Sequence, residues 1–464
     1  MGITPPRASE QPPPADAFLE RLLGALNHLP PTRRWWVAYS GGRDSTVLLH
    51  TLAGLRPLLP ADLELRAVHV DHGLSRHSGE WARHCEAACA VLGIPCQTLR
   101  VNAKPQPGES PEAAARQARY RAIAALIEPA DGLLTAHHQD DQAETLLLQL
   151  LRGAGPHGLA AMPAHVPFSK GFIARPLLGF ARDELAAYAA QHSLSWIEDP
   201  SNSDTGFNRN HLRHAVMPRL TERWPACAAT LSRAAGHAAE AAVLLDALAD
   251  GDLQTMRSSR PDTLAVTPLL QLSAARARNA LRRWFKKLDL PAPWTSHLDR
   301  IQTDVLRAAE DSMPCVRWPG AEVRRYRDIL YAMRPLPPHD PGAVLQWDMA
   351  QPLTLPDGSL LTARTVIGGG LKTSLCHAQP VTVRFRQGGE RCRPAGRGHT
   401  HELKKLFQER GIPPWQRERI PLIFVGDQLA AVVGLWICEP FQAEGGEEGI
   451  VVEWNDPYPR PITV

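Results

Sequence analysis

A glycine-rich loop between a buried strand and a helix constrains the fold more than any other part of this sequence. Residues 35–39 are apolar or aromatic and predict a buried strand, while residues 45–55 predict a helix. The loop between them consists of Ser40, Gly41, Gly42, Arg43, Asp44 and Ser45. Glycines let the backbone approach a ligand closely, and a helix N-terminus presents free N–H groups with a partial positive charge. The unit predicts a phosphate-binding domain, with an ordinary Gly-rich turn as the alternative.

Strands and helices alternate through the residues that follow. Further apolar runs predict strands at 65–70, 97–101 and 133–136. Helices are expected at 79–92, 110–127 and 141–151. This alternation is typical of a parallel sheet covered on both faces. The predicted fold class is α/β: an N-terminal Rossmann-like parallel sheet that carries the phosphate loop, then a helical domain and a small α+β C-terminal domain.

The length of 464 residues suggests about three domains at roughly 150 residues each. Residues 1–30 are expected to form a Pro-rich N-terminal extension, and residues 31–215 the phosphate-binding catalytic domain. Residues 216–334 are Ala-rich and then basic, and they predict a helical domain. Residues 335–464 begin with a Pro-rich linker and are expected to form the α+β domain.

Composition restricts the class of protein. The 8 Cys residues contain no C-x-x-C pair, so reduced thiols in the core are expected rather than a metal or redox site. No stretch approaches the ~20 apolar residues that span a bilayer, and no secretory signal is visible. A cytoplasmic protein without a membrane partner is expected. The net charge of +3 is too small to indicate nucleic-acid binding by itself.

Acidic residues open the helix that follows the fourth predicted strand. Asp140 and Glu144 are four residues apart and Asp141 and Glu144 three apart, so on a helix they share a face. Clustered carboxylates repel one another and are typical of a cation site, and Mg²⁺ bound to ATP is the expected cation. A favourable interaction with the helix dipole would explain Asp140 and Asp141 without a ligand. It would not explain His137 and His138 before them.

Polar residues also end the second predicted strand. His69, Asp71 and His72 lie where ligands bind in open α/β sheets, so a substrate-facing site and a structural role are both open. Arg116 and Arg119 share a helix face, where they either reach phosphates or lie on the surface.

Together these residues resemble the PP-loop ATP pyrophosphatases and, more closely, the tRNA(Ile)-lysidine synthetase family. The resemblance covers residues 35–215 and 381–440 well and 216–380 weakly. Its matching stretches are Ser40–Ser45, His69–Leu74, the helix with Glu112, Arg116, Arg119 and Tyr120, Ala136–Thr145, Gly155–Leu159, Arg175–Leu178, Glu198–Asn202, Asn208–Asn210 with Arg213, Leu403–Gln408 and Ile412–Trp415. Arg43 occupies the variable position of the loop, and the Pro-rich lead before Phe18 has no counterpart in the family.

The resemblance implies a reaction. ATP adenylates the oxygen on carbon 2 of the wobble cytidine in the CAU anticodon of isoleucine tRNA, and free L-lysine then displaces AMP to form lysidine. It also implies residue roles. The ATP-binding residues would be Ser40, Gly41, Gly42, Arg43, Asp44, Ser45, His69 and Arg116. The catalytic residues would be Asp44, Asp140, Asp141 and Glu144, with Asp140 and Glu144 as ligands of Mg²⁺. Lysine would be bound by Asp71, His72 and His138.

Basic residues cluster in two later segments, around 276–287 and 384–419, as contact with a phosphate backbone requires. The candidates for tRNA binding are Arg209, Arg213, Arg283, Arg397, Lys404 and Lys405. A solvated helix face is the alternative for the first segment. Methionine tRNA carries the same anticodon bases, and a thousandfold preference needs about 4 kcal/mol, more than the roughly 1–3 kcal/mol of one base contact. The two later domains are therefore expected to read tRNA outside the anticodon.

Three alternatives stay open at this point. A tRNA thiolase would need paired catalytic Cys residues, and the only close pair, Cys85 and Cys89, falls on the core face of a helix. A small-molecule amidating ligase would leave the basic C-terminal segments unexplained. A tRNA-binding protein with a vestigial ATP site is disfavoured by the intact loop. Either a monomer or a homodimer is compatible with the sequence.

Overall fold

The computed structural model describes residues 15–73, 77–105, 111–258, 260–309 and 312–455, and the chain divides into two compact units, Met1–Leu245 and Asp246–Val464. Of the expected N-terminal extension, residues 1–14 therefore lie outside the described residues. No helix in the described part of the chain is long and apolar enough to cross a membrane.

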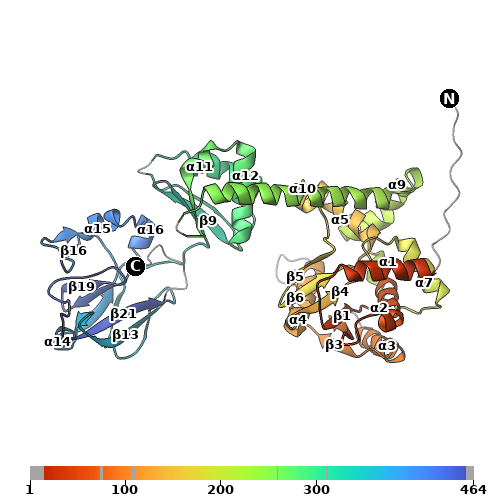
Figure 1. The fold of residues 1–464 in the computed structure, drawn as a ribbon, viewed down its shortest axis with the longest axis horizontal. Helices are drawn as coiled ribbons and strands as arrows, with labels where there is room; N and C mark the ends of the chain where they lie inside the picture. Colours follow the sequence, from red (N-terminus) through yellow and green to blue (C-terminus); the bar gives the residue numbers. More distant parts are fainter. Residues whose placement is uncertain (1–14, 74–76, 106–110, 259, 310–311, 456–464) are drawn as a thin grey trace. The chain divides into compact units, whose positions relative to one another are not determined.

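The first unit is built on a six-stranded sheet with the strand order β3-β2-β1-β4-β6-β5 (Figure 1). Its strands are β1 (Arg34–Ala38), β2 (Glu64–Asp71), β3 (Cys96–Arg100), β4 (Asp131–Leu134), β5 (His165–Phe168) and β6 (Gly171–Ala174). All neighbouring strands are parallel except β5, which is antiparallel to β6. The predicted parallel sheet is confirmed. The strand order reverses between β1 and β4, which is where ligands bind in such sheets.

Helices α1, α2, α3 and α7 cover one face of this sheet and α4 the other, while α9 packs against α5. The bounds of the helices are α1 (Ala15–Asn27), α2 (Arg43–Leu55), α3 (Ser78–Val91), α4 (Pro111–Leu126), α5 (Gln139–Leu151), α6 (Pro156–Leu159), α7 (Arg182–Gln191), α8 (Asn208–His211) and α9 (Met217–Arg223). Side chains alternate along β1, so Trp35 and Val37 pack in one core with α1, α2, α3 and α7. Trp36 faces the other core, with Ile123 and Ile127 at the α4 side. This double cover explains why the strands read as continuous apolar runs.

Residues 15–27, which the sequence-based division places in the N-terminal extension, form helix α1. Its Phe18, Leu22 and Leu26 recur every fourth residue and are buried in the same core as Trp35. The apolar stripe is short and follows a Pro-rich stretch, and for that reason it was not recognised. This helix therefore belongs structurally to the unit that carries the phosphate loop.

The second unit begins within the long helix α10 (Cys227–Thr255). Helices α11 (Val266–Gln271), α12 (Ala274–Lys287) and α13 (Thr295–Arg300) follow. An antiparallel sheet accompanies them, made of β7 (Thr263–Ala265), β8 (Cys315–Trp318), β9 (Ala321–Tyr326) and β10 (Ile329–Met333). The region expected to be mostly helical is thus mixed, because Leu281 and Phe285 of α12 share one core with Val316 and Val323 of the sheet.

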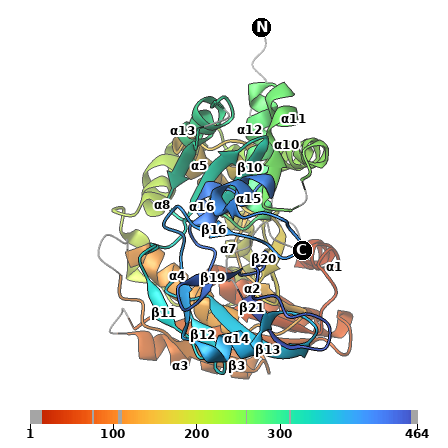
Figure 2. The same cartoon turned by 90° about the vertical axis from the view of Figure 1, so that its left-hand side faces the viewer.

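The C-terminal part contains two antiparallel sheets (Figure 2, blue). One is formed by β11 (Val344–Gln346), β15 (Val381–Arg384), β18 (Leu422–Val425), β19 (Gln428–Val432) and β20 (Trp436–Ile437). The other is formed by β12 (Leu353–Thr354), β13 (Leu360–Ile367), β14 (Leu371–Lys372) and β21 (Glu448–Asn455). Ile423 faces the core between the sheets, and Leu422 faces helix α15 (Leu403–Glu409), so the predicted α+β arrangement is confirmed.

Cys392 and Cys438 are joined by a disulfide in the second unit, with Cα atoms 5.8 Å apart. Reduced thiols were expected at all Cys positions, so this expectation is wrong for these two residues. They are 46 positions apart, so spacing does not indicate the pairing. The β16–β17 hairpin (Arg391–Cys392 and His401–Glu402) and β20 bring them together in the fold. Cys85 and Cys89 are free and buried, as expected.

Candidate active site

The phosphate loop lies at the carboxyl end of β1, where the strand order reverses. Gly41 has φ +82°, and a Cβ atom there would lie 2.6 Å from Ile197 Cδ1 and 2.9 Å from Cys85 Sγ. Only glycine fits both the backbone conformation and the space. The N–H of Ile197 donates to the carbonyl of Gly41 at 2.8 Å, and this hydrogen bond anchors the loop. Gly42 is the N-cap of α2, so the free N–H groups of that helix point to the loop.

The two serines of the loop stabilise its shape. Ser40 Oγ accepts a hydrogen bond from the N–H of Gly42 at 3.3 Å and lies 3.1 Å from Ser45 Oγ. Ser45 Oγ donates to the Gly42 carbonyl at 2.9 Å. Asp44 Oδ1 accepts a hydrogen bond from Arg43 Nε at 3.0 Å. All six predicted loop residues are therefore in one compact turn.

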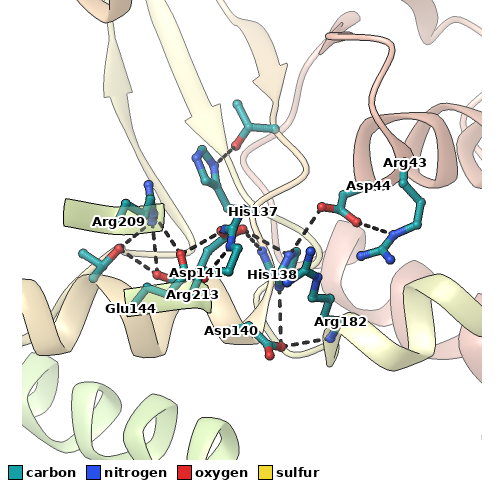
Figure 3. Close-up of polar contacts among 12 residues, drawn as sticks. Arg43, Asp44, His137, His138, Asp140, Asp141, Glu144, Arg182, Arg209 and Arg213 are labelled. Carbon is teal, nitrogen blue, oxygen red and sulfur yellow. Dashed lines mark hydrogen bonds and ion pairs between the residues drawn. The ribbon is translucent and has the colours of Figure 1, made fainter. Parts of the chain in front are cut away.

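His138 joins the loop to the acidic helix α5 (Figure 3). Its side chain is almost completely buried and is surrounded by three carboxylates. His138 Nε2 lies 3.5 Å from Asp44 Oδ2 and 3.5 Å from Asp141 Oδ2, and its Nδ1 lies 3.6 Å from Asp140 Oδ2. The cluster thus brings together residues that are almost 100 positions apart in the sequence.

The charges of this cluster support one another. Burial lowers the pKa of His138, but the hydrogen bonds and charges of Asp140, Asp44 and Asp141 outweigh it and raise that pKa to about 9. Burial raises the pKa of Asp44, but His138 and Arg43 outweigh it and lower that pKa to about 2. His138 is therefore a cation at neutral pH, and Asp44 is ionised.

Asp140 is held by the start of α7. Its Oδ2 accepts a hydrogen bond from the backbone N–H of Arg182 at 2.9 Å, and Oδ2 also faces His138. Burial opposes ionisation, yet these two donors lower the pKa of Asp140. Within the described residues both contacts engage Oδ2, which leaves Oδ1 for a further ligand.

Glu144 lies on the same helix but has different partners. It is 2% exposed. Arg213 Nε donates to Glu144 Oε1 at 2.7 Å, and Arg209 Nε donates to Oε2 at 3.0 Å. Arg213 Nη2 also donates to Asp141 Oδ1 at 2.9 Å. Burial lowers the pKa of Arg213, and Glu144 and Asp141 outweigh that effect and raise it.

Asp140 and Glu144, expected to hold Mg²⁺ together, have different partners in this structure. Both oxygens of Glu144 are taken by guanidinium groups, and the described residues contain no group of three or more His, Cys, Asp or Glu side chains arranged to hold a metal ion. Helical spacing placed both carboxylates near one face but gave no sign of the two arginines. Asp140 alone keeps a carboxylate oxygen of the kind that Mg²⁺ prefers.

Residues at the end of β2 occupy the same edge of the sheet. His69 is buried, and its Nδ1 lies 3.0 Å from the carbonyl oxygen of Tyr39, immediately before the phosphate loop. Asp71 Oδ1 accepts a hydrogen bond from the N–H of Gly73 at 2.9 Å. Burial and the charge of Arg119 lower the pKa of His72, which is therefore neutral at pH 7. Leu74 and the side chain of Glu112 lie outside the described residues.

Most of the tRNA-binding candidates have carboxylate partners. Arg209 and Arg213 pair with Glu144, Arg283 pairs with Asp246 and Asp250, and Arg397 pairs with Glu409. Lys404 and Lys405 are exposed, and neither forms an ion pair in the described part of the chain. Arg209 and Arg213 have a buried carboxylate partner that charge alone does not reveal, and tRNA binding by the six residues stays a prediction.

Several contributors were missed at the level of sequence. The backbone of Arg182 holds Asp140, and Ile197 and Cys85 pack beneath Gly41. His137 lies beside the cluster with Nδ1 2.9 Å from Thr135 Oγ1, and burial lowers its pKa to about 4 despite the nearby Asp141. Arg182 and Ile197 carry no signal in the sequence. Cys85 and His137 were noted, as one of a close Cys pair and as a residue before the acidic helix, but neither pattern specifies the role seen here.

Comparison with known proteins gives the family. A PP-loop domain model matches residues 15–220, a model of the TilS substrate binding domain matches residues 264–331, and one of the TilS substrate C-terminal domain matches residues 381–454. The chain is 47% identical to tRNA(Ile)-lysidine synthase of Coxiella burnetii over 94% of this chain and 97% of that protein. It is 44% identical to that of Methylococcus capsulatus over 92% and 97% of the two chains. The chain therefore belongs to the tRNA(Ile)-lysidine synthase family.

Proposed function

We propose that this enzyme ligates free L-lysine to carbon 2 of the wobble cytidine in the CAU anticodon of isoleucine tRNA. ATP adenylates the oxygen on carbon 2 and pyrophosphate leaves. The lysine amine then attacks carbon 2 and AMP leaves, which forms lysidine. The observation that carries the proposal is the convergence of the phosphate loop, Asp44 and the α5 carboxylates at the β1–β4 edge, in a chain that spans nearly all of its relatives' length.

The phosphate loop would bind the pyrophosphate part of ATP. The N–H groups at the start of α2 and the Ser40 and Ser45 hydroxyls supply neutral donors, and Arg43 supplies a positive charge. His69 stiffens the end of β1, and Arg116 is exposed on α4 at the nearby edge. We propose that Mg²⁺ enters as the counter-ion of ATP and that Asp140 Oδ1 is its protein ligand, in place of the pair Asp140 and Glu144.

Lysine must attack as a neutral amine, so its site needs a carboxylate to bind the ammonium and a group to take the proton. Asp71 and the neutral His72 offer this combination at the end of β2. The buried His138 is cationic and would repel the ammonium, so we propose that His138 positions Asp44, Asp140 and Asp141 instead of binding lysine.

The tRNA would be bound partly by the C-terminal domain. Lys404 and Lys405 are exposed on α15, where they can contact the phosphate backbone outside the anticodon. The reacting groups all lie on one chain, which either a monomer or a homodimer would allow.

The thiolase alternative is disfavoured by the position of the cysteines. Cys85 and Cys89 are fully buried in the core between the sheet and its helices. Burial raises the pKa of Cys85 to about 12, so its thiol is protonated and unreactive at neutral pH.

Exchange of labelled pyrophosphate into ATP tests the proposed order of steps. Adenylation precedes lysine attack, so exchange is expected with tRNA present and lysine absent, and addition of lysine should convert exchange into net AMP release. Exchange that proceeds without tRNA would show that another molecule is adenylated, and the proposed substrate would then be wrong.

A further inference from the structure

Arg116, Arg119 and Arg175 form a second group of cations, and none of the described carboxylates forms an ion pair with them. His137 lies between this group and the α5 carboxylates, because its pKa responds to Arg175, Arg116 and Asp141. Arg175 follows β6 at the carboxyl edge, next to the loop after β4, where the Thr135 N–H donates to the Ala174 carbonyl at 2.9 Å. Arg116, on α4, is close enough for its charge to lower the pKa of Arg175 further, after burial. None of the ion pairs of the described residues involves Arg116, Arg119 or Arg175.

Arg175 is the most informative member of this group. Arg175 is buried, with 9% of its surface exposed. Nη1 donates to the Pro163 carbonyl at 2.8 Å, but the buried Nε has no hydrogen-bond partner among the described residues. A buried guanidinium without a counter-charge is strongly unfavourable, and arginine is the residue that best matches a phosphate through two parallel N–H donors. Arg209 and Arg213, by contrast, find this counter-charge in Glu144.

Among the described residues, the charges that act on the pKa of Arg175 come from Tyr120 and Arg116 and not from a carboxylate. His137 is neutral, because burial and the charges of Arg175, Arg209 and Arg116 outweigh that of Asp141. Tyr120 packs against Arg116, with the guanidinium 4.9 Å from the ring centroid. The site therefore has an excess of positive charge that an anionic ligand would balance.

We propose that Arg175 binds a backbone phosphate of the substrate RNA beside the reacting nucleotide. The inference rests on the proposed function. In the sheet order β4 separates β6 from β1, whose loop already offers donors for the phosphates of ATP. A phosphodiester is the other phosphate that the reaction brings to this edge, and its binding would hold the cytidine ring beside the α5 carboxylates.

The variant Arg175→Gln tests this assignment through the salt dependence of tRNA binding. Without this phosphate contact, the slope of log Kd against log salt should fall by about 0.7, the value for single-stranded RNA or DNA, and tRNA binding should weaken about tenfold at low salt. The Kd for ATP should not change. The matched control is Lys170→Ala, which removes one positive charge at the opposite end of β6, where Lys170 is exposed and pairs with Glu128.

An unchanged slope and Kd for tRNA in a folded Arg175→Gln protein would overturn the proposal, and so would a loss confined to ATP binding, which would assign the site to the nucleotide. If Arg175→Gln does not fold, Arg175→Lys keeps the charge but loses the planar donors. It should then raise the Kd for tRNA several-fold at unchanged slope, and an unchanged Kd would overturn the proposal. Lysine incorporation by the unmodified enzyme, measured in parallel, fails only if the proposed function itself is wrong.

Discussion

Two groups of arginine–carboxylate pairs in this chain have the same chemistry in different surroundings. In the first unit Arg209 and Arg213 hold Glu144, which is 2% exposed. In the second unit the α12 residues Arg283 and Lys287 pair with Asp246 and Asp250 of α10, all of them partly exposed. We call the first group the buried cluster and the second the α10–α12 ladder.

Because the two groups differ in burial, removal of one partner is expected to cost a different amount of stability in each. Removing one partner of a buried pair leaves an uncompensated charge and costs roughly 3–5 kcal/mol, while an exposed pair contributes about 0–1 kcal/mol. Side-chain hydrogen bonds from Arg283 and Lys287 lower the pKa of Asp250, but water screens the ladder. A run of basic residues therefore predicts neither a ligand nor stability until its acidic neighbours and their burial are known.

The largest effect is expected for Glu144→Gln. The change keeps the shape but leaves Arg209 without its charge partner and Arg213 with Asp141 alone, so the free energy of unfolding should fall by about 3 kcal/mol. Lysidine formation should fall about 100-fold as α5 loses its position. Denaturant unfolding and single-turnover kinetics measure the two losses. The ladder variant Asp250→Asn should lose less than about 1 kcal/mol, and equal losses in the two variants would remove the distinction between the groups.

The next effect is a pH dependence of stability at His138, which lies among the carboxylates of Asp44, Asp140 and Asp141. The raised pKa of His138, about 9 against an ordinary 6.5, contributes stability that is complete below pH 6.5 and is lost as the pH rises through 9. In His138→Gln this contribution is absent. The difference in free energy of unfolding between wild type and variant should therefore shrink by up to about 3 kcal/mol from pH 6.5 to 9.

Asp44 acts at the other end of the pH scale. Its lowered pKa, about 2 against 3.8, contributes stability that is present above pH 3.8 and is lost as the pH falls through 2.

The α10–α12 ladder contains no histidine, so Arg283→Ala serves as the control for the pH dependence of His138→Gln. A constant difference between wild type and His138→Gln across pH 6.5–9 would show that His138 is not held as a cation.

A smaller effect is expected from the unpaired lysines of α15. The double variant Lys404→Ala and Lys405→Ala should raise the KM for tRNA a few-fold and lower the slope of log affinity against log salt by about 0.9 for each phosphate that is no longer neutralised. The kcat should be preserved, because neither lysine belongs to the unit that carries the catalytic edge. Steady-state kinetics at several salt concentrations would detect this, and a fall in kcat alone would argue against a binding role.

The smallest effect is expected for Arg283→Ala. Because Arg283 is engaged by Asp246 and Asp250, its removal should change the free energy of unfolding by less than about 1 kcal/mol and leave the KM for tRNA unchanged. A KM increase as large as that of the lysine variant would restore Arg283 as a tRNA contact and would show that the ladder opens when tRNA binds.

The sequence was sufficient for the sheet and for the location of the site. Apolar runs and the glycine loop specify β1, α2 and their neighbours, because local pattern and burial agree there. The end of each parallel strand can also be predicted locally. Asp44, Asp71 and Asp140 each follow such an end, so they were expected at one edge of the sheet, and the structure places them there.

The partners of these residues could not be predicted. Glu144 lies 65 positions from Arg209, and His138 lies 94 positions from Asp44, so no local pattern connects them. The sheet of β7, β8, β9 and β10 was not predicted for a related reason. Its strands have only three to six residues and are stabilised by packing against α12. Helical spacing could not show the partners of Asp140 and Glu144 either. It indicates the helix face on which a side chain lies, but not which residues pack against that face.

Mass spectrometry of the modified tRNA tests the central claim most directly. The purified enzyme would be incubated with ATP, Mg²⁺, free lysine and unmodified isoleucine tRNA with a CAU anticodon, and the tRNA would be digested to nucleosides. We expect a cytidine that carries one lysine, formed together with one AMP. Release of AMP and pyrophosphate without a lysine adduct would contradict the proposed nucleophile, and absence of both products would contradict the proposed reaction.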